Sequence, residues 1–180
     1  MSRKLLIALE AIDGVGKTTV AQILAQLMGA EYVKTPTADI YNQRHYYDQC
    51  GDPLVRFMFY LNSNLITSRY IAPILEEKPV VCDRYLVSTI VFHQAMGVDT
   101  SIVDVDRLPI LKPDFYFCLQ AEEKVRLERL HSRGVLSDTD GQIDLLRRAD
   151  KLLPQYCTQV IDTTYITAEE VANIIYSTVS

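Results

Sequence analysis

The chain has 180 residues, of which 48% are hydrophobic and 23% charged, and its formal net charge is -5. This length predicts one domain with a substantial core, and this composition excludes a disordered or fibrous chain. The acidic balance argues against a broad surface for nucleic acid or anionic membrane, because both need clustered Lys and Arg. No stretch approaches the about 18 apolar residues of a membrane helix. We therefore expect neither nucleic acid nor membrane as a partner.

The four cysteines are widely spaced and form no C-x-x-C pair, and two of them lie in apolar runs typical of core strands. This usage is typical of a reduced intracellular protein. The first apolar run ends at Glu10, too early for a signal peptide, and no cleavage pattern follows. A cytoplasmic location is expected.

Apolar runs and helical spacings alternate along the chain. The expected strands are 5–10, 31–34, 79–83, 114–119 and 159–162, and the expected helices are 17–28, 54–75, 86–96, 122–132 and 168–178. Gly29 favours a left-handed cap after the first helix, and Thr167 is the expected N-cap of the last one, with two acidic residues in its first turn. This alternation predicts an α/β fold with a five-stranded parallel sheet between layers of helices, and a site at the carboxyl ends of the strands.

A glycine-rich segment joins the first strand to the first helix and reads Ala11-Ile12-Asp13-Gly14-Val15-Gly16-Lys17-Thr18. It matches the P-loop pattern G-x-x-x-x-G-K-[ST] except at its first position. Such a loop points backbone N–H groups at phosphate oxygens, and the helix N-terminus adds its positive dipole end. Lys17 is expected to bridge the β- and γ-phosphates of ATP, and Thr18 to coordinate Mg²⁺. The predicted nucleotide-binding residues are Asp13, Gly14, Val15, Gly16, Lys17, Thr18 and Thr19.

Ala11 raises a question about this loop, because it replaces the first glycine. If the position needs a positive φ, a β-carbon is awkward there, whereas a negative φ makes alanine inexpensive. The alternative interpretation of the segment is a turn that only connects a strand to a helix. A lysine in the first helical turn opposes the helix dipole, however, and this favours an anion-binding loop.

A second polar cluster follows the third predicted strand, where Asp83 and Arg84 stand at its carboxyl end and Ser88 comes five residues after Asp83. A carboxylate there can hold a magnesium-bound water or accept a hydrogen bond from an acceptor. A guanidinium can bind an acceptor phosphate through two hydrogen bonds. The alternative is a structural ion pair at the end of the strand.

Together the two segments resemble the thymidylate kinase family, whose hallmarks are F-E-G-x-D-G-x-G-K-[ST]-T and D-R-Y-x-x-S-x-x-A-[YF]. Here residues 9–19 read LEAIDGVGKTT and residues 83–92 read DRYLVSTIVF. The resemblance spans nearly the whole chain. It implies a three-layer α/β/α P-loop kinase fold in one domain, 1–180, with a small lid at about 134–141. It also implies transfer of the ATP γ-phosphoryl group, with Mg²⁺, to dTMP or a related nucleotide, in a homodimer.

The same resemblance implies roles at the acceptor site. Asp13 is expected to read the sugar 3′-hydroxyl, and Arg84 to bind the acceptor phosphate with Asp83 near magnesium. Phe59 is expected to stack on the base and Phe92 to line the pocket, although phenylalanines at helical positions are also commonly core residues. The predicted catalytic residues are Lys17, Asp83, Arg84, Arg133 and Arg148; the predicted substrate-binding residues are Asp13, Lys34, Phe59, Arg84, Ser88 and Phe92; and the predicted metal ligands are Thr18 and Asp83.

Segments outside the two hallmarks also depart from the family pattern. Lys34-Thr35-Pro36 replaces Arg-Glu-Pro, and Ser63 stands where an arginine reads thymine. The lid segment contains no cation, so we expect the transition-state charge to be met by a flanking arginine: Arg133, Arg147 or Arg148. Two of these could equally form solvated surface pairs. The departures leave open a kinase for a nucleoside or another metabolite, and a nucleotide-binding regulatory module without transfer activity.

Overall fold

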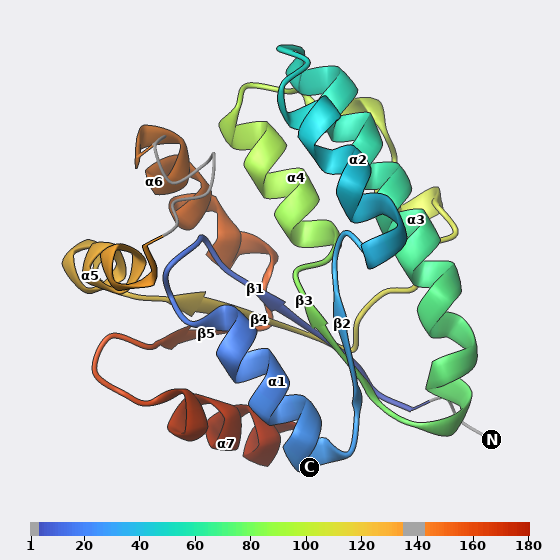
Figure 1. Cartoon of the computed structure of the whole chain (residues 1–180). Helices are drawn as coiled ribbons and strands as arrows, with labels where there is room; N and C mark the ends of the chain where they lie inside the picture. The colour runs from blue at the N-terminus through green and yellow to red at the C-terminus, as the bar shows by residue number, and fades with distance from the viewer. Residues whose placement is uncertain (1–3, 135–142) are drawn as a thin grey trace.

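The structure, a computed structural model, describes residues 4–134 and 143–180. Five strands form one sheet in the order β2-β3-β1-β4-β5 (Figure 1), and every neighbouring pair is parallel. The strands are β1 (Leu6–Glu10), β2 (Glu31–Lys34), β3 (Val80–Asp83), β4 (Phe115–Gln120) and β5 (Gln159–Asp162). The predicted five-stranded parallel sheet is confirmed, and the expected strand ends agree with the structure to within one residue.

The five expected helices are all present, together with two that were not predicted. The helices are α1 (Lys17–Met28), α2 (Ala38–Asp48), α3 (Pro53–Glu77), α4 (Leu86–Ala95), α5 (Glu123–Arg133), α6 (Ile143–Leu152) and α7 (Ala168–Val179), with short 3₁₀ turns at Thr100–Ile102, Val105–Arg107 and Leu153–Tyr156. The unpredicted α2 is polar and buries only Ile40, so it carries little helical apolar pattern. The unpredicted α6 follows closely on the expected lid. No described helix is both long and apolar enough to span a membrane.

Both faces of the sheet are covered, because α1 and α7 lie on one side of it and α3 and α4 on the other (Figure 1). The side chains of β1 alternate between these layers. Leu6 and Ala8 belong to the core beside α3, whereas Ile7 and Leu9 belong to the core beside α1 and α7. A central strand buried on both faces has little freedom to shift. The carboxyl ends of β1 and β3, where the predicted site residues stand, are therefore held side by side.

A buried glutamate at the end of β1 fixes the start of α4. Glu10 is 0% exposed. One of its carboxylate oxygens accepts from the Tyr85 N–H at 3.0 Å, and the other accepts from the Ser88 N–H at 3.2 Å and from the Ser88 hydroxyl. These donors belong to the first turn of α4, so Glu10 caps that helix from the neighbouring strand. Burial raises the pKa of Glu10 to about 7, although the Ser88 hydrogen bond opposes the shift.

This carboxyl group makes stability depend on pH. Its pKa rises from 4.5 to about 7 on folding, so between these values the folded state binds more protons than the unfolded state. The contribution to the free energy of unfolding is complete below about pH 4.5 and is lost as the pH rises through about 7. The difference in unfolding free energy between the wild type and Glu10→Gln should fall by about 3 kcal/mol over this range.

Urea unfolding at a series of pH values measures this difference. Glu128→Gln, at an exposed position on α5, controls for the loss of a carboxylate as such. Parallel pH profiles for the wild type and Glu10→Gln would show that Glu10 does not titrate in this range.

Candidate functional site

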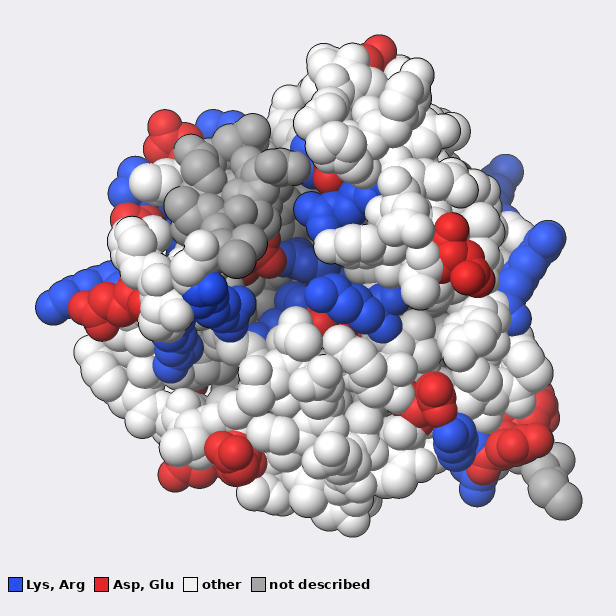
Figure 2. Space-filling view, viewed as in Figure 1, with Lys and Arg blue, Asp and Glu red and all other residues white. Residues whose placement is uncertain are grey.

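A cavity of about 610 Å³ opens at the carboxyl ends of the strands. Its lining contains six cationic side chains and two carboxylates, although the net charge of the whole chain is -5. Figure 2 shows Lys and Arg side chains collected in the hollow in the middle of this face. The cations are Lys17, Lys34, Arg44, Arg56, Arg84 and Arg133, and the carboxylates are Asp13 and Asp48. A concave cationic lining of this kind suits a polyanionic ligand.

The backbone of the P-loop answers the question that Ala11 raised. Among the described residues other than glycine, only Arg84 has a positive φ, so Ala11 does not occupy a position that requires glycine. Gly14 and Gly16 do, with φ values of 94° and 96°. A β-carbon on Gly14 would lie 2.6 Å from Cγ of Arg126, because the loop closes directly against α5. The alanine is therefore compatible with the loop conformation, and the two glycines are required by it.

Side chains from neighbouring elements donate hydrogen bonds to backbone carbonyl groups of this loop. Arg126 donates to the Asp13 carbonyl at 3.2 Å, and the Thr163 hydroxyl donates to the Val15 carbonyl at 2.9 Å. The N-cap residue, Gly16, has no side chain to cap α1, and the first turn of α1 contains no acidic residue. No negative side chain therefore offsets the positive end of α1, and Lys17 adds a further positive charge there, so this helix end is suited to an anion.

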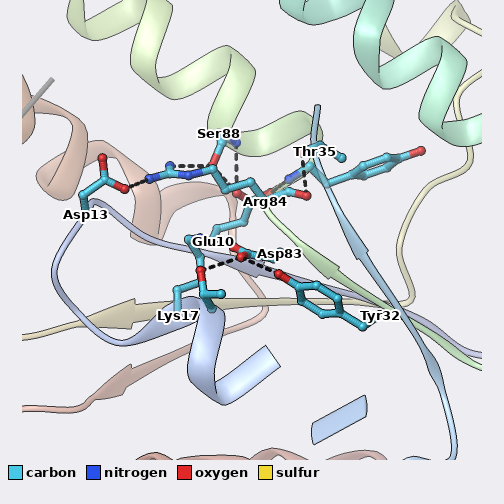
Figure 3. A network of polar contacts seen from close by, with 10 residues as sticks. Glu10, Asp13, Lys17, Tyr32, Thr35, Asp83, Arg84 and Ser88 are labelled. Atoms are coloured by element: carbon cyan, nitrogen blue, oxygen red, sulfur yellow. Dashed lines mark hydrogen bonds and ion pairs between the residues drawn. The ribbon is translucent and has the colours of Figure 1, made fainter. Parts of the chain in front are cut away.

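The Asp83 carboxylate joins the P-loop to β3 (Figure 3). It accepts from the Lys17 ammonium, from the Thr18 hydroxyl at 2.6 Å and from the Tyr32 hydroxyl at 3.1 Å. Burial alone would raise the pKa of Asp83, but the Lys17 charge beside it brings the pKa below its ordinary value. Asp83 is therefore ionised. Tyr32 was not predicted, although it shares a face of β2 with Lys34, two residues further on.

The Thr18 hydroxyl and the Asp83 carboxylate are oxygen ligands of the kind that Mg²⁺ prefers. Among the described residues, no group of three or more His, Cys, Asp or Glu side chains could hold a metal by itself. This fits magnesium, which usually takes one or two protein oxygens and completes its shell with water and substrate phosphates. The two predicted ligands, Thr18 and Asp83, therefore form a site of the kind that Mg²⁺ occupies.

Arg84 directs its guanidinium into the cavity from a strained turn. Its φ is 67°, a conformation that costs an L-residue about 1 kcal/mol or more. The guanidinium donates to Asp13 at 2.5 Å and to Ser88 at 3.3 Å, and it lies 5.0 Å from the centre of the Phe92 ring. The Thr35 hydroxyl donates to the Arg84 carbonyl at 3.0 Å and supports the turn. The structure thus brings together Asp13, Arg84, Ser88 and Phe92, and it places Lys34 on the same cavity wall.

Phe59 does not line this cavity. It is 8% exposed, and its ring stacks on Tyr47 at 4.2 Å, beside a separate hollow between α2 and α3. Tyr60 lines the cavity instead, because one residue turns a helix by about 100°. Phe59, the predicted base-stacking residue, therefore lies outside the cavity lining, whereas its neighbour Tyr60 lies within it. Ser63 and Asn64 are each 2% exposed, and neither lines the cavity.

The predicted arginines separate into two groups. Arg133, in the last turn of α5, lines the cavity. Arg148 does not, because its Nε donates to the Ala95 carbonyl at 2.9 Å where α6 meets α4. Arg147 pairs with Glu123 at 2.7 Å on the surface. The structure therefore does not support the catalytic role predicted for Arg148. Thr19 is exposed on α1 outside the cavity lining, and the predicted lid, 134–141, lies outside the described residues apart from Gly134.

The far end of the cavity contains a polar cluster that was not predicted. The buried carboxylate of Asp48 accepts from the Arg44 Nε at 2.7 Å and from the Tyr60 hydroxyl at 3.0 Å, and it pairs with Arg56 at 2.9 Å. Asp48 and Arg44 belong to α2, the helix without a clear sequence pattern. The sequence therefore offered no signal for the cluster.

Comparisons with known proteins agree with this geometry. Residues 9–174 match the family model described as thymidylate kinase. A probable thymidylate kinase from Methanocaldococcus jannaschii is 29% identical over 177 residues, covering 96% of this chain and 94% of the relative. A probable thymidylate kinase from Archaeoglobus fulgidus is 31% identical over 156 residues, covering 82% of this chain and 79% of the relative.

Solved structures share the fold. A thymidylate kinase from Candida albicans aligns with a TM-score of 0.76 at 17% identity, covering 99% of this chain and 92% of the other. A deoxyadenosine kinase from M. mycoides aligns with a TM-score of 0.68 at 18% identity, covering 97% and 98%. The family model spans most of the chain, and the chain belongs to the thymidylate kinase family, whose members are ATP-dependent nucleoside monophosphate kinases with a P-loop.

Proposed function

We propose that the protein transfers the γ-phosphoryl group of ATP to a nucleoside monophosphate, with dTMP as the preferred acceptor. The observation that carries this proposal is the arrangement of two anion-binding groups in one cavity. Lys17 and Thr18 stand at the start of α1, and Arg84 stands at the end of the adjacent strand β3. A donor phosphate and an acceptor phosphate could thus meet between them.

On the donor side, Gly14 and Gly16 shape the loop around the ATP phosphates, and Lys17 neutralises charge on them. Thr18 and Asp83 would hold Mg²⁺, which when bound neutralises charge that develops on the transferred group. In the structure Lys17 and Thr18 both contact Asp83. ATP would draw Lys17 onto phosphate, while Tyr32 keeps the Asp83 carboxylate in position. Arg133 is the described arginine best placed to meet additional charge during transfer.

On the acceptor side, Arg84 and Lys34 would bind the acceptor phosphate. Asp13 accepts from Arg84 in this structure, and it would accept from the sugar 3′-hydroxyl when a nucleotide is bound. Tyr60 offers a flat ring for the base, and Phe92 closes the wall beside the sugar. The protein's contribution to the reaction is therefore mainly to position two phosphates and to stabilise charge between them.

The remaining proposals concern the whole chain. One kinase domain over 1–180 with a lid at about 134–141 fits the continuous sheet and the family match. A cytoplasmic location fits the free state of all four cysteines. A homodimer is supported by an apolar stripe along α3, where Val55, Met58, Ile66 and Tyr70 are 43%, 48%, 41% and 52% exposed.

ADP formation from ATP and Mg²⁺ over a panel of nucleoside monophosphates and nucleosides tests the proposed function. We expect the fastest turnover with dTMP, turnover only when an acceptor is present, and its loss when Mg²⁺ is chelated. Transfer only to a nucleoside would instead identify a nucleoside kinase. Tight ATP binding without turnover for any acceptor would favour a regulatory module.

Arg84→Gly separates the role of this arginine in transfer from a structural role. Glycine adopts a φ of 67° without strain, so the melting temperature should stay within a few degrees of the wild type. The kcat/KM for dTMP should fall about 100-fold or more, because the charged partner of a buried phosphate is lost. ATP affinity should not change. Arg107→Ala, at an exposed surface pair, is the matched control. An equal loss of ATP binding and transfer would mean that Arg84 has a structural role.

The dimer proposal predicts that a charge in the α3 stripe separates the subunits. Met58→Glu should sediment as a monomer at micromolar concentrations where the wild type is a dimer, because a buried unpaired carboxylate opposes association. Ile174→Glu places the same charge at a 41% exposed apolar position on α7 and should leave the dimer intact. Sedimentation of the wild type as a monomer would contradict the proposal.

A further inference from the structure

The wall of the cavity contains a buried hydrogen-bond acceptor without a partner among the described residues. His93 lies on α4, is 2% exposed and lines the cavity about one turn beyond Thr89. Its Nδ1 lies 2.6 Å from the Thr89 carbonyl oxygen. A carbonyl oxygen only accepts, so Nδ1 must carry the hydrogen. This contact fixes the tautomer of the ring.

The other ring nitrogen is therefore an acceptor. Burial lowers the pKa of His93 to about 4, so the imidazole is neutral at neutral pH. In the neutral ring with a hydrogen on Nδ1, Nε2 carries a lone pair. This Nε2 is buried and has no hydrogen-bond partner among the described residues. Buried polar atoms are nearly always paired in native proteins, so a donor from a ligand or an ordered water is expected.

The donors of Tyr60 and Asn64 are already committed. The Tyr60 ring lies 5.6 Å from His93, but its hydroxyl donates to Asp48 at 3.0 Å. The Asn64 amide donates to the Tyr60 carbonyl at 2.9 Å and to the Thr89 hydroxyl at 2.7 Å. Arg56 has no hydrogen-bond partner at Nε among the described residues, but an ion pair with Asp48 at 2.9 Å holds its side chain. Each of these side chains would therefore give up an existing contact in order to satisfy Nε2.

The same neighbourhood lacks the base-reading group of the family pattern. Ser63 stands where the pattern has an arginine, and both Ser63 and its neighbour Asn64 are 2% exposed and lie outside the cavity lining. Asn64 donates both amide hydrogens to protein groups. Neither residue supplies a guanidinium to the cavity, so the polar groups that do line this wall are the candidates for recognition of the base.

We propose that His93 selects the acceptor base by accepting, at Nε2, a hydrogen bond from a ring N–H on the base edge. The proposal rests on the proposed function, because it requires a nucleotide base in this cavity. Thymine and uracil carry a hydrogen on N3 and match the lone pair. Cytosine carries a lone pair on N3, so two acceptors would face each other. His93 would thus favour thymine and uracil over cytosine.

Steady-state kinetics of His93→Leu and His93→Gln test this role against a core-packing role. Leucine keeps the volume but cannot accept, so the KM for dTMP should rise about tenfold, the value of roughly one hydrogen bond, with kcat nearly unchanged. The preference for dTMP over dCMP should fall by a similar factor. Glutamine offers an acceptor oxygen and should retain most of the preference. His131→Leu, at an exposed position on α5, is the matched control.

A nucleotide analogue tests the same contact in the wild-type protein, and it needs no variant to fold. N3-methyl-dTMP lacks the donor, so the wild type should use it at least about tenfold less well than dTMP. Equal use of both nucleotides, or an unchanged dTMP preference in a folded His93→Leu, would overturn the proposal while leaving the kinase function intact. A folded wild-type protein that transfers to no monophosphate would overturn the proposed function itself, and this inference with it.

Discussion

The site depends on one buried carboxylate, that of Asp83 at the end of β3. Because β1 and β3 are neighbours in register, the P-loop that follows β1 opens directly beside Asp83 at the end of β3. The Asp83 carboxylate contacts Lys17, Thr18 and Tyr32, and the Lys17 charge beside it is the main cause that keeps its pKa low despite burial. The next residue, Arg84, turns into the same cavity. Asp83 at the end of β3 and Arg84 directly after it therefore join the proposed donor side to the proposed acceptor side.

Much of the fold could be predicted because the sheet is buried on both faces. Continuous apolar runs mark such strands, and glycines and capping residues mark the ends of helices such as α1 and α7, where Thr167 and Glu170 form the predicted cap. The polar helix α2 could not be predicted, because it buries only Ile40 and carries almost no periodic apolar pattern. The acceptor end of the cavity includes residues of this helix. The part of the cavity that we propose to contact the acceptor base was consequently the least visible in the sequence.

The P-loop, unlike α2, could be predicted from the sequence. The conformation of a P-loop depends on a few neighbouring residues, so a short motif identifies Gly14, Gly16, Lys17 and Thr18. Ala11 is tolerated in the loop because its φ is not positive. Phe59 shows the limit of a motif on a helix, because neighbouring residues on a helix point in different directions, and here Tyr60 lines the cavity while Phe59 is 8% exposed outside its lining. Contacts such as those of Glu10 and His93 join residues on different elements or depend on burial, and no local pattern records them.

We propose that the P-loop and Arg84 bind the donor and acceptor phosphates side by side in one continuous cavity. A bisubstrate analogue, with adenosine and thymidine joined through their 5′ oxygens by a polyphosphate, tests this arrangement by calorimetric competition. We expect that one molecule binds per chain, more tightly than either ATP or dTMP, and that it displaces both nucleotides together. Displacement of ATP alone, with dTMP still bound at an independent site, would contradict it.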